Sequence, residues 1–357
     1  MPVLTIGIPT YNGAFNFEDL FASIQNLGLN EDEFEILVVD NASTDNTAEV
    51  VEHLKARYRN IRFHQNTVNI GRTENWDKVV ELAKGEYLIL MNVNDRFLKF
   101  DAAKHLKYLD SNKSITMLFA DIHIVHSGTD HLFPNFKESG VITLSKYLAK
   151  TFLDPHYMEY NSLGMPQQHI FRTEIITKNN IKFDNKIPRT TDRVFVGEVV
   201  NAGGGLFYYT TEVLVRWQIN NKRFHHSAHL NNQELDLNSI WMNEYKANLA
   251  LARIAEISMK DFLWCQLVFA KFFTYKYKIS SAAKMLSIPV PDISLDEISA
   301  HIYYEYIKVI AKLNGISLNE FSAASTALFK VLRLPLQKFK IIKRDDRSIR
   351  DIVTEYQ

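Results

Sequence analysis

The sequence predicts an α/β protein with a doubly wound sheet, followed by an all-helical C-terminal region. The prediction rests on apolar runs that suit strands buried on both faces and on the amphipathic segments between them. After about residue 230 the apolar spacing becomes helical throughout. Strand–helix–strand alternation requires right-handed crossovers, which place the strands in one sheet. We therefore expect a first domain over residues 1–230 and a helical region over residues 231–357.

The individual elements follow from local spacing. Near-continuous apolar runs predict strands at residues 3–9, 35–40 and 86–91. Apolar side chains at helical spacing predict helices at residues 17–27, 47–58 and 73–83. Asn16 is the expected N-cap of the first of these helices, because an Asn side chain can accept a hydrogen bond from a free helical N–H.

Polar residues follow each predicted strand. The segment Pro9–Asn12 follows the first, Asp40–Ser43 the second and Asn92–Asp95 the third. In open α/β sheets, ligands bind at the carboxyl ends of the strands, so we expect the site at this edge. Neither a Rossmann glycine pattern nor a P-loop follows the first strand, which excludes both of these nucleotide-binding classes.

Composition limits the partners. The 357 residues carry 41 basic and 41 acidic side chains, and this balance argues against a nucleic-acid partner, which would require a basic excess. The single cysteine, Cys265, excludes a disulfide framework. We identify neither a signal peptide nor an apolar stretch near the roughly 18 residues of a spanning helix. A cytoplasmic protein is expected.

Four segments occur in an informative order: Ile8–Asn12, Val38–Thr47, Asn69–Arg72 and Ala83–Asp95. Together they resemble family 2 glycosyltransferases, and the resemblance covers roughly the first 225 residues. It implies the GT-A fold with its mixed sheet, a nucleotide-sugar donor and an inverting transfer to an acceptor hydroxyl. Residues 1–100 would form the nucleotide-sugar-binding half and residues 101–230 the acceptor-binding half.

The resemblance assigns a nucleotide site. Its residues would be Pro9, Thr10, Tyr11, Asp40, Asn41, Arg72 and Asn94. Asp40 would accept a hydrogen bond from the base, and Arg72 would lie near the diphosphate. Because the Tyr11 and Asp40 positions suit a pyrimidine, a UDP-sugar is the expected donor.

The resemblance also implies a Mn²⁺ or Mg²⁺ site, at which this chain departs from the family. The family segment has the form Asp-x-Asp-Asp, whereas here Asn92 and Asn94 precede the single acid Asp95. An amide oxygen can bind a hard cation but adds no negative charge, so weaker metal binding is predicted. His225 or His226 could supply a further ligand. The alternative is a catalytically impaired protein that binds nucleotide sugars or acts as a scaffold.

A later segment offers the catalytic base. Gly164–Arg172 and Thr190–Phe195 resemble the acceptor-side segment of the family, in which an acid opens a helix. Asp192 takes that place and would accept the proton of the acceptor hydroxyl. The alternative for Asp192 is a helix cap paired with Arg189 or Arg193.

The C-terminal region is basic near its end. Residues 328–344 hold six basic residues and no acidic one, interleaved with apolar side chains. This composition suits a segment lying on an anionic membrane surface, with a solvated helix end as the alternative. Aromatic residues before it would form either a core or a homodimer contact. A glycan or lipid-linked glycan is the expected acceptor, at the inner face of the cytoplasmic membrane.

Overall fold

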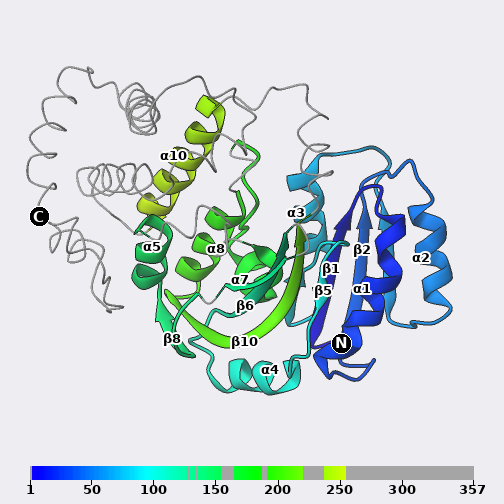
Figure 1. The fold of residues 1–357 in the computed structure, drawn as a ribbon, viewed down its shortest axis with the longest axis horizontal. Coiled ribbons are helices and arrows are strands. Elements are labelled where there is room, and N and C mark those ends of the chain that lie inside the picture. The colour runs from blue at the N-terminus through cyan, green and yellow to red at the C-terminus, as the bar shows by residue number, and fades with distance from the viewer. Residues whose placement is uncertain are drawn as a thin grey trace, which may run out of the picture. The chain divides into compact units, whose positions relative to one another are not determined.

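A computed structural model of the chain describes residues 2–126, 129–133, 135–153, 165–186, 191–219 and 237–254 (Figure 1). The chain divides into two compact units, Met1–Leu144 with Ser162–Ser227, and Ser145–Asn161 with Ala228–Gln357. His225, His226 and residues 328–344 lie outside the described residues. In the second unit the described helices are α5 (Leu144–Leu153), which begins at the last residue of the first unit, and α10 (Leu237–Ile254). The remainder of the predicted helical region stays a prediction.

The first part of the sheet is parallel, as predicted. Its strands, in spatial order, are β3 (Ile61–Gln65), β2 (Phe34–Asp40), β1 (Leu4–Thr10) and β4 (Tyr87–Leu90). Every residue of β1 and β2 is buried, which explains their continuous apolar sequence. The register pairs Thr10 with Asp40 and Asp40 with Gln65, so the three strands β1, β2 and β3 end at one edge.

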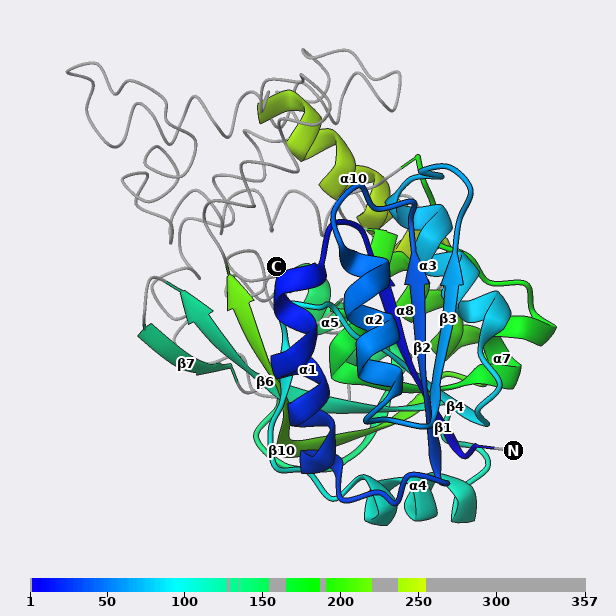
Figure 2. The same cartoon turned by 90° about the vertical axis from the view of Figure 1, so that its right-hand side faces the viewer.

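Three helices connect these strands at the predicted positions. They are α1 (Phe17–Ile24), α2 (Thr47–Lys55) and α3 (Arg72–Leu82). Figure 2 shows α1 and α2 side by side in front of the strands. The third helix, α3, packs on β1 and β2, where Gly7 leaves room for Val79: a Cβ at Gly7 would lie 2.3 Å from Val79 Cγ1.

The second part of the sheet is mixed. The strand β9 (His169–Arg172) lies antiparallel between β4 and β6 (Met117–His126). The long strand β10 (Leu206–Ile219) runs parallel to β6 and antiparallel to β5 (Arg96–Phe97). Two further strands, β7 (Thr129–Phe133) and β8 (Gly140–Thr143), pair with β6 and β10.

The remaining helices of this unit are short or lie between strands. They are α4 (Ala102–Ser111), α7 (Thr173–Lys178), α8 (Thr191–Ala202) and the 3₁₀ turns η1 (Ala14–Asn16), η2 (Gln25–Leu27) and η3 (Pro166–Gln168). None of the helices in the described part of the chain has both the length and the apolar character that crossing a membrane would require.

The expected side-chain cap at Asn16 is wrong. Asn16 does occupy the N-cap position of α1, but its side chain makes no capping hydrogen bond to the helix. Its amide group donates to Oδ1 of Asn94. The interaction with a loop at the sheet edge therefore replaces the local one, and it ties the start of α1 to the polar segment after β4.

Candidate active site

Asp40 ends β2 and is buried, with hydrogen bonds on both carboxylate oxygens. Ser43 donates its backbone N–H to Oδ2 at 3.2 Å and its hydroxyl to Oδ1, and Gln65 Nε2 donates to Oδ2 at 2.9 Å. The Asp40 side chain thus holds the loop that follows its own strand. A nucleotide base would have to compete with these donors, and the base contact stays a prediction.

The loop after β1 is braced against the loop after β2. Asn12, in the left-handed region at φ 52°, accepts the Thr44 N–H on its side-chain oxygen at 2.8 Å. Its own backbone N–H donates to Ser43 Oγ at 2.8 Å. Pro9 and Thr10 are buried, whereas Tyr11 is 38% exposed. Of the nucleotide-site residues predicted here, Tyr11 is therefore the one with an accessible ring.

Asn41 belongs to a network of asparagine side chains. Its amide nitrogen donates to Asn69 Oδ1 at 2.8 Å and to the Gly71 carbonyl at 3.1 Å, and its oxygen accepts from Asn66 Nδ2 at 3.1 Å. Gly71 has φ 96°, a conformation that a glycine adopts without strain. The network thus holds the segment that precedes Arg72, the first residue of α3.

Asp95 lies in a buried polar cluster and is only 1% exposed. Its Oδ2 accepts from Asn92 Nδ2 at 3.1 Å and from Gln167 Nε2 at 3.2 Å, and its Oδ1 accepts the Gln218 N–H at 3.3 Å. Burial raises the pKa of Asp95 to about 7, against the opposing effects of the Asn92 and Gln218 hydrogen bonds and the charge of Arg96. Burial is thus the dominant influence on this carboxyl group.

Two members of this cluster, Gln167 and Gln218, were not predicted from the sequence. Gln167 is buried on η3, between Pro166 and Gln168, and Gln218 contributes only its backbone. Neither position carries a spacing or composition signal. Only the pairing of β10 with β5, which brings Arg216 beside Arg96, places Gln218 near Asp95.

The residues around Asp95 form a weak donor set for Mn²⁺ or Mg²⁺. One carboxylate is present, the Asn92 amide turns its nitrogen to that carboxylate, and Asn94 Oδ1 accepts from Asn16. Over the described ranges, no cluster of three His, Cys, Asp or Glu side chains could hold a metal ion. A hard divalent cation prefers several oxygen ligands with negative charge. These residues therefore fit a cation only with low affinity.

A second grouping brings Arg72 and Asp192 together. Both line one pocket, with Thr73, Trp76, Phe183 and Thr191. Asp192 is the second residue of α8, so the predicted acid at a helix start is confirmed in position, and its Oδ1 accepts the Arg193 N–H at 3.0 Å. Arg72 and Asp192, from distant parts of the sequence, thus line the same pocket. Trp76 was not predicted as a site residue. The sequence feature that could have indicated it is its place one helical turn after Arg72, a spacing at which a cation and a ring can meet.

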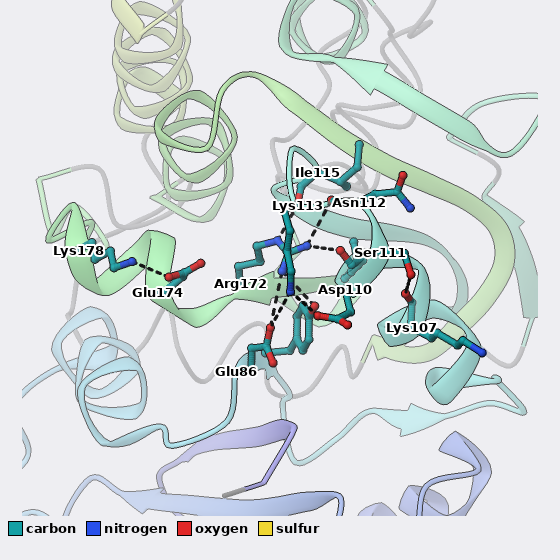
Figure 3. A network of polar contacts seen from close by, with 12 residues as sticks. Glu86, Lys107, Asp110, Ser111, Asn112, Lys113, Ile115, Arg172, Glu174 and Lys178 are labelled. Carbon is teal, nitrogen blue, oxygen red and sulfur yellow. Dashed lines mark hydrogen bonds and ion pairs between the residues drawn. The ribbon is translucent and has the colours of Figure 1, made fainter.

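Arg172 lies at the opposite edge of the sheet, although it ends a segment predicted to be on the acceptor side (Figure 3). It is 3% exposed; its Nε donates to the Ile115 carbonyl at 2.8 Å and its Nη1 to the Tyr87 hydroxyl at 3.0 Å. Its Nη2 donates to the Leu109 carbonyl near the end of α4. A guanidinium bonded to backbone carbonyls in this way stabilises the fold rather than a ligand.

Comparison with known sequences finds similarity to glycosyltransferases. Residues 5–169 match the model of glycosyl transferase family 2. An uncharacterized glycosyltransferase of Methanocaldococcus jannaschii is 24% identical over 222 residues, which are 62% of this chain and 72% of the relative. The abequosyltransferase RfbV of Salmonella typhimurium is 35% identical over 114 residues. That alignment spans 32% of this chain and only 34% of the Salmonella enzyme.

Solved structures share the architecture. TarS of S. aureus (residues 1–349), crystallised with UDP-GlcNAc, has a TM-score of 0.60 at 17% identity, over 100% of this chain and 91% of the other. The mannosyltransferase PcManGT of Pyrobaculum calidifontis, in complex with GDP-Man and Mn²⁺, has a TM-score of 0.51 at 13% identity, over 87% and 86% of the two chains. The mixed sheet of this chain has the GT-A fold of these structures, and residues 5–169 are similar to glycosyl transferase family 2.

Proposed function

We propose that the chain transfers a sugar with inversion from a nucleotide sugar, a UDP-sugar by preference, to an acceptor hydroxyl. The observation that carries the proposal is the pocket that places Asp192 and Arg72 around one space. An inverting transfer requires a base at the acceptor and positive charge at the leaving diphosphate. This pocket offers one residue of each kind.

The proposed reaction is a single displacement at the anomeric carbon. Asp192 accepts the proton of the acceptor hydroxyl while the acceptor oxygen forms a bond to that carbon. The bond from the anomeric carbon to the diphosphate oxygen breaks, and the electron pair leaves with the nucleoside diphosphate. Arg72 and the N-terminus of α3 stabilise the negative charge that develops there.

A divalent cation would assist this departure. Mn²⁺ or Mg²⁺ would be held by Asp95, with amide oxygens of Asn92 or Asn94 and the diphosphate completing its ligands, and it would neutralise the leaving group. Because the donor set has one carboxylate, we expect activity to require more metal than in relatives with a fully acidic segment.

Relatives and composition support the acceptor class. The Salmonella relative is an abequosyltransferase, and a poly(ribitol-phosphate) β-glucosyltransferase of Bacillus spizizenii is 25% identical over 195 residues. We propose a glycan or lipid-linked glycan of surface polysaccharide assembly as acceptor. The basic residues 328–344 would hold the enzyme on the inner face of the cytoplasmic membrane.

A non-catalytic nucleotide-sugar-binding protein is the second candidate. It is favoured by the three hydrogen-bond donors on Asp95, which a metal ion would have to displace. Release of UDP from UDP-GlcNAc in the presence of Mn²⁺ separates the two, since a transferase hydrolyses its donor slowly in the absence of acceptor. GDP-mannose and UDP-glucose serve as parallel donors.

The decisive variant is Asp192→Asn. We expect it to lower donor turnover by about a hundredfold or more, because a base contributes that much in general acid–base catalysis, while the UDP-dependent thermal shift stays unchanged. Asp184→Asn removes an exposed carboxylate before α8 and serves as the matched control. Wild-type turnover in Asp192→Asn would show that Asp192 is not the base.

A further inference from the structure

A row of three aromatic rings in contact, called the stack below, connects the two sides of the pocket: Trp76, Phe183 and Phe195. The guanidinium carbon of Arg72 lies 5.9 Å from the centre of the Trp76 ring. Trp76 meets Phe183 edge to face, with centroids 5.1 Å apart and planes at 86°. Phe183 then stacks on Phe195 with centroids 4.0 Å apart and planes at 7°. The stack runs from α3 through the loop at Phe183 to α8.

Each end of this stack lies one helical turn from a residue of the proposed chemistry. Trp76 is four residues after Arg72 on α3, and Phe195 is three residues after Asp192 on α8. Side chains at these spacings share a helix face. The face of α8 that stacks on Phe183 is therefore the face that presents Asp192, and the face of α3 that meets Phe183 is the face that presents Arg72.

Hydrogen bonds hold the middle ring on α3. The Phe183 N–H donates to Asp77 Oδ1 at 3.0 Å, and Asn185 Nδ2 donates to Glu74 Oε1 at 3.0 Å. The loop that carries Phe183 is thus fixed to α3 by its backbone as well as by its ring. On the other side, Phe195 also meets Phe171 of β9 edge to face, with centroids 5.6 Å apart, which anchors the stack in the sheet.

We infer that Trp76 is a positioning residue: through Phe183 and Phe195 it sets the distance between Arg72 and Asp192 across the pocket. The inference rests on the proposed roles of these two residues. Aromatic pairs of this geometry prefer defined separations, so the stack acts as a spacer between the two helices. A leucine at position 76 would keep an apolar contact but lose the ring edge that meets Phe183 and the ring face beneath Arg72.

The test compares Trp76→Leu with Trp76→Phe and with Phe183→Leu, which removes the middle ring. In both leucine variants we expect backbone hydrogen exchange at the hydrogen-bonded amides of α8, beyond its first turn, to rise about tenfold, because the helix loses its packing on Phe183. Misplacement of a reacting group costs rate rather than binding, so UDP-GlcNAc hydrolysis should fall about tenfold or more. The Kd for UDP should change by less than about threefold, and Trp76→Phe should restore both properties.

The matched control is Phe21→Leu. Phe21 is a buried ring on α1 with edge contacts to Phe17 and Tyr58, so its loss lowers stability without touching the stack. Unchanged exchange at α8 in both leucine variants, or an equal rise in Phe21→Leu, overturns the inference. Full hydrolysis by Asp192→Asn overturns the proposed base instead. The positioning role alone is overturned by a third outcome. In that outcome Asp192→Asn loses hydrolysis, whereas Trp76→Leu and Phe183→Leu hydrolyse UDP-GlcNAc at the wild-type rate.

Discussion

The two ends of β9 carry polar groups in contrasting states. At its carboxyl end, the Arg172 guanidinium donates to carbonyl and hydroxyl oxygens and lies 3.9 Å from Glu86 Oε1. At its amino end, η3 positions Gln167 so that its side-chain amide donates a hydrogen bond to the buried carboxylate of Asp95. Here Gln168 Oε1 and His169 Nε2 are buried without a hydrogen-bond partner.

At the Arg172 end the polar groups stabilise the fold, whereas at the Asp95 end they include buried atoms that could bind a ligand. Buried polar atoms are normally hydrogen-bonded, and the exceptions lower stability. At the Arg172 end the guanidinium is hydrogen-bonded to its neighbours (Figure 3). At the Asp95 end, burial raises the pKa of the carboxyl group to about 7. Variants at the first end should therefore change stability, and variants at the second should change ligand binding.

The largest effect is expected for Arg172→Met. Loss of the guanidinium removes a hydrogen-bond donor from the carbonyls of Leu109 and Ile115 and from the Tyr87 hydroxyl, so the free energy of unfolding should fall by about 3–5 kcal/mol. Urea unfolding measures this change. Arg57→Met is the control, because Arg57 forms an exposed ion pair with Glu18, and surface ion pairs contribute little to stability. Equal losses in the two variants would remove the contrast between the edges.

A smaller effect on stability is expected at His169, the first residue of β9. Burial lowers the pKa of His169 from 6.5 to about 3, against a hydrogen bond to the Met165 carbonyl that raises it. Because the unfolded chain binds this proton more readily, stability falls as the pH drops below 6.5, by about 2 kcal/mol between about pH 7 and pH 5. His169→Phe, which keeps a ring between Phe119 and Phe171, should lose that part of the acid sensitivity.

Urea unfolding at both pH values provides the measurement for His169. The variant should be less stable than the wild type at neutral pH, because the Met165 carbonyl loses one of its two hydrogen-bond partners and keeps the Gln168 N–H. The difference between the two proteins should then shrink in acid. Parallel pH dependences in the wild type and the variant would show that His169 does not titrate in this range.

The smallest effect concerns the metal. Asn92→Asp with Asn94→Asp restores the acids of the family segment and should raise Mn²⁺ affinity about tenfold, or about 1.4 kcal/mol. Calorimetric titration of Mn²⁺ in the presence of UDP measures it. The exposed Asp110 offers a control, since Asp110→Asn removes an acid remote from Asp95 and should leave the affinity unchanged. Unchanged Mn²⁺ affinity in the double variant would contradict the metal site at Asp95.

The parallel half of the sheet was predictable because its strands are buried on both faces. Continuous apolar runs marked β1, β2 and β4, and the helices between them had clear apolar stripes. The position of β9 between β4 and β6 was not predictable, since its pairing depends on contacts between distant segments. Asn16 shows the same limit on a small scale, because a tertiary partner replaced its local cap.

The site was predictable where a residue type carries the chemistry. Asp192 and Arg72 stood out as an acid and a cation at helix starts, and the structure places them at one pocket. For Asp40 and Asn41 the strand pattern indicated only that polar groups end a strand, whereas in the fold Asp40 accepts from Gln65 at the end of β3 and Asn41 donates to Asn69 beyond it. Gln167 had no signal, because an amide in a polar run is distinguished only by what it contacts.

The contacts of Asp95 imply an order of events during folding. Its partners Gln167 and Gln218 lie 72 and 123 residues further along the chain. Closing such long loops is slow, whereas the neighbouring strands β1 and β2 and the helices between them can form from nearer segments. We expect the parallel half of the sheet to collapse first, so that a nascent chain acquires a sheet edge well before Asp95 reaches its final surroundings.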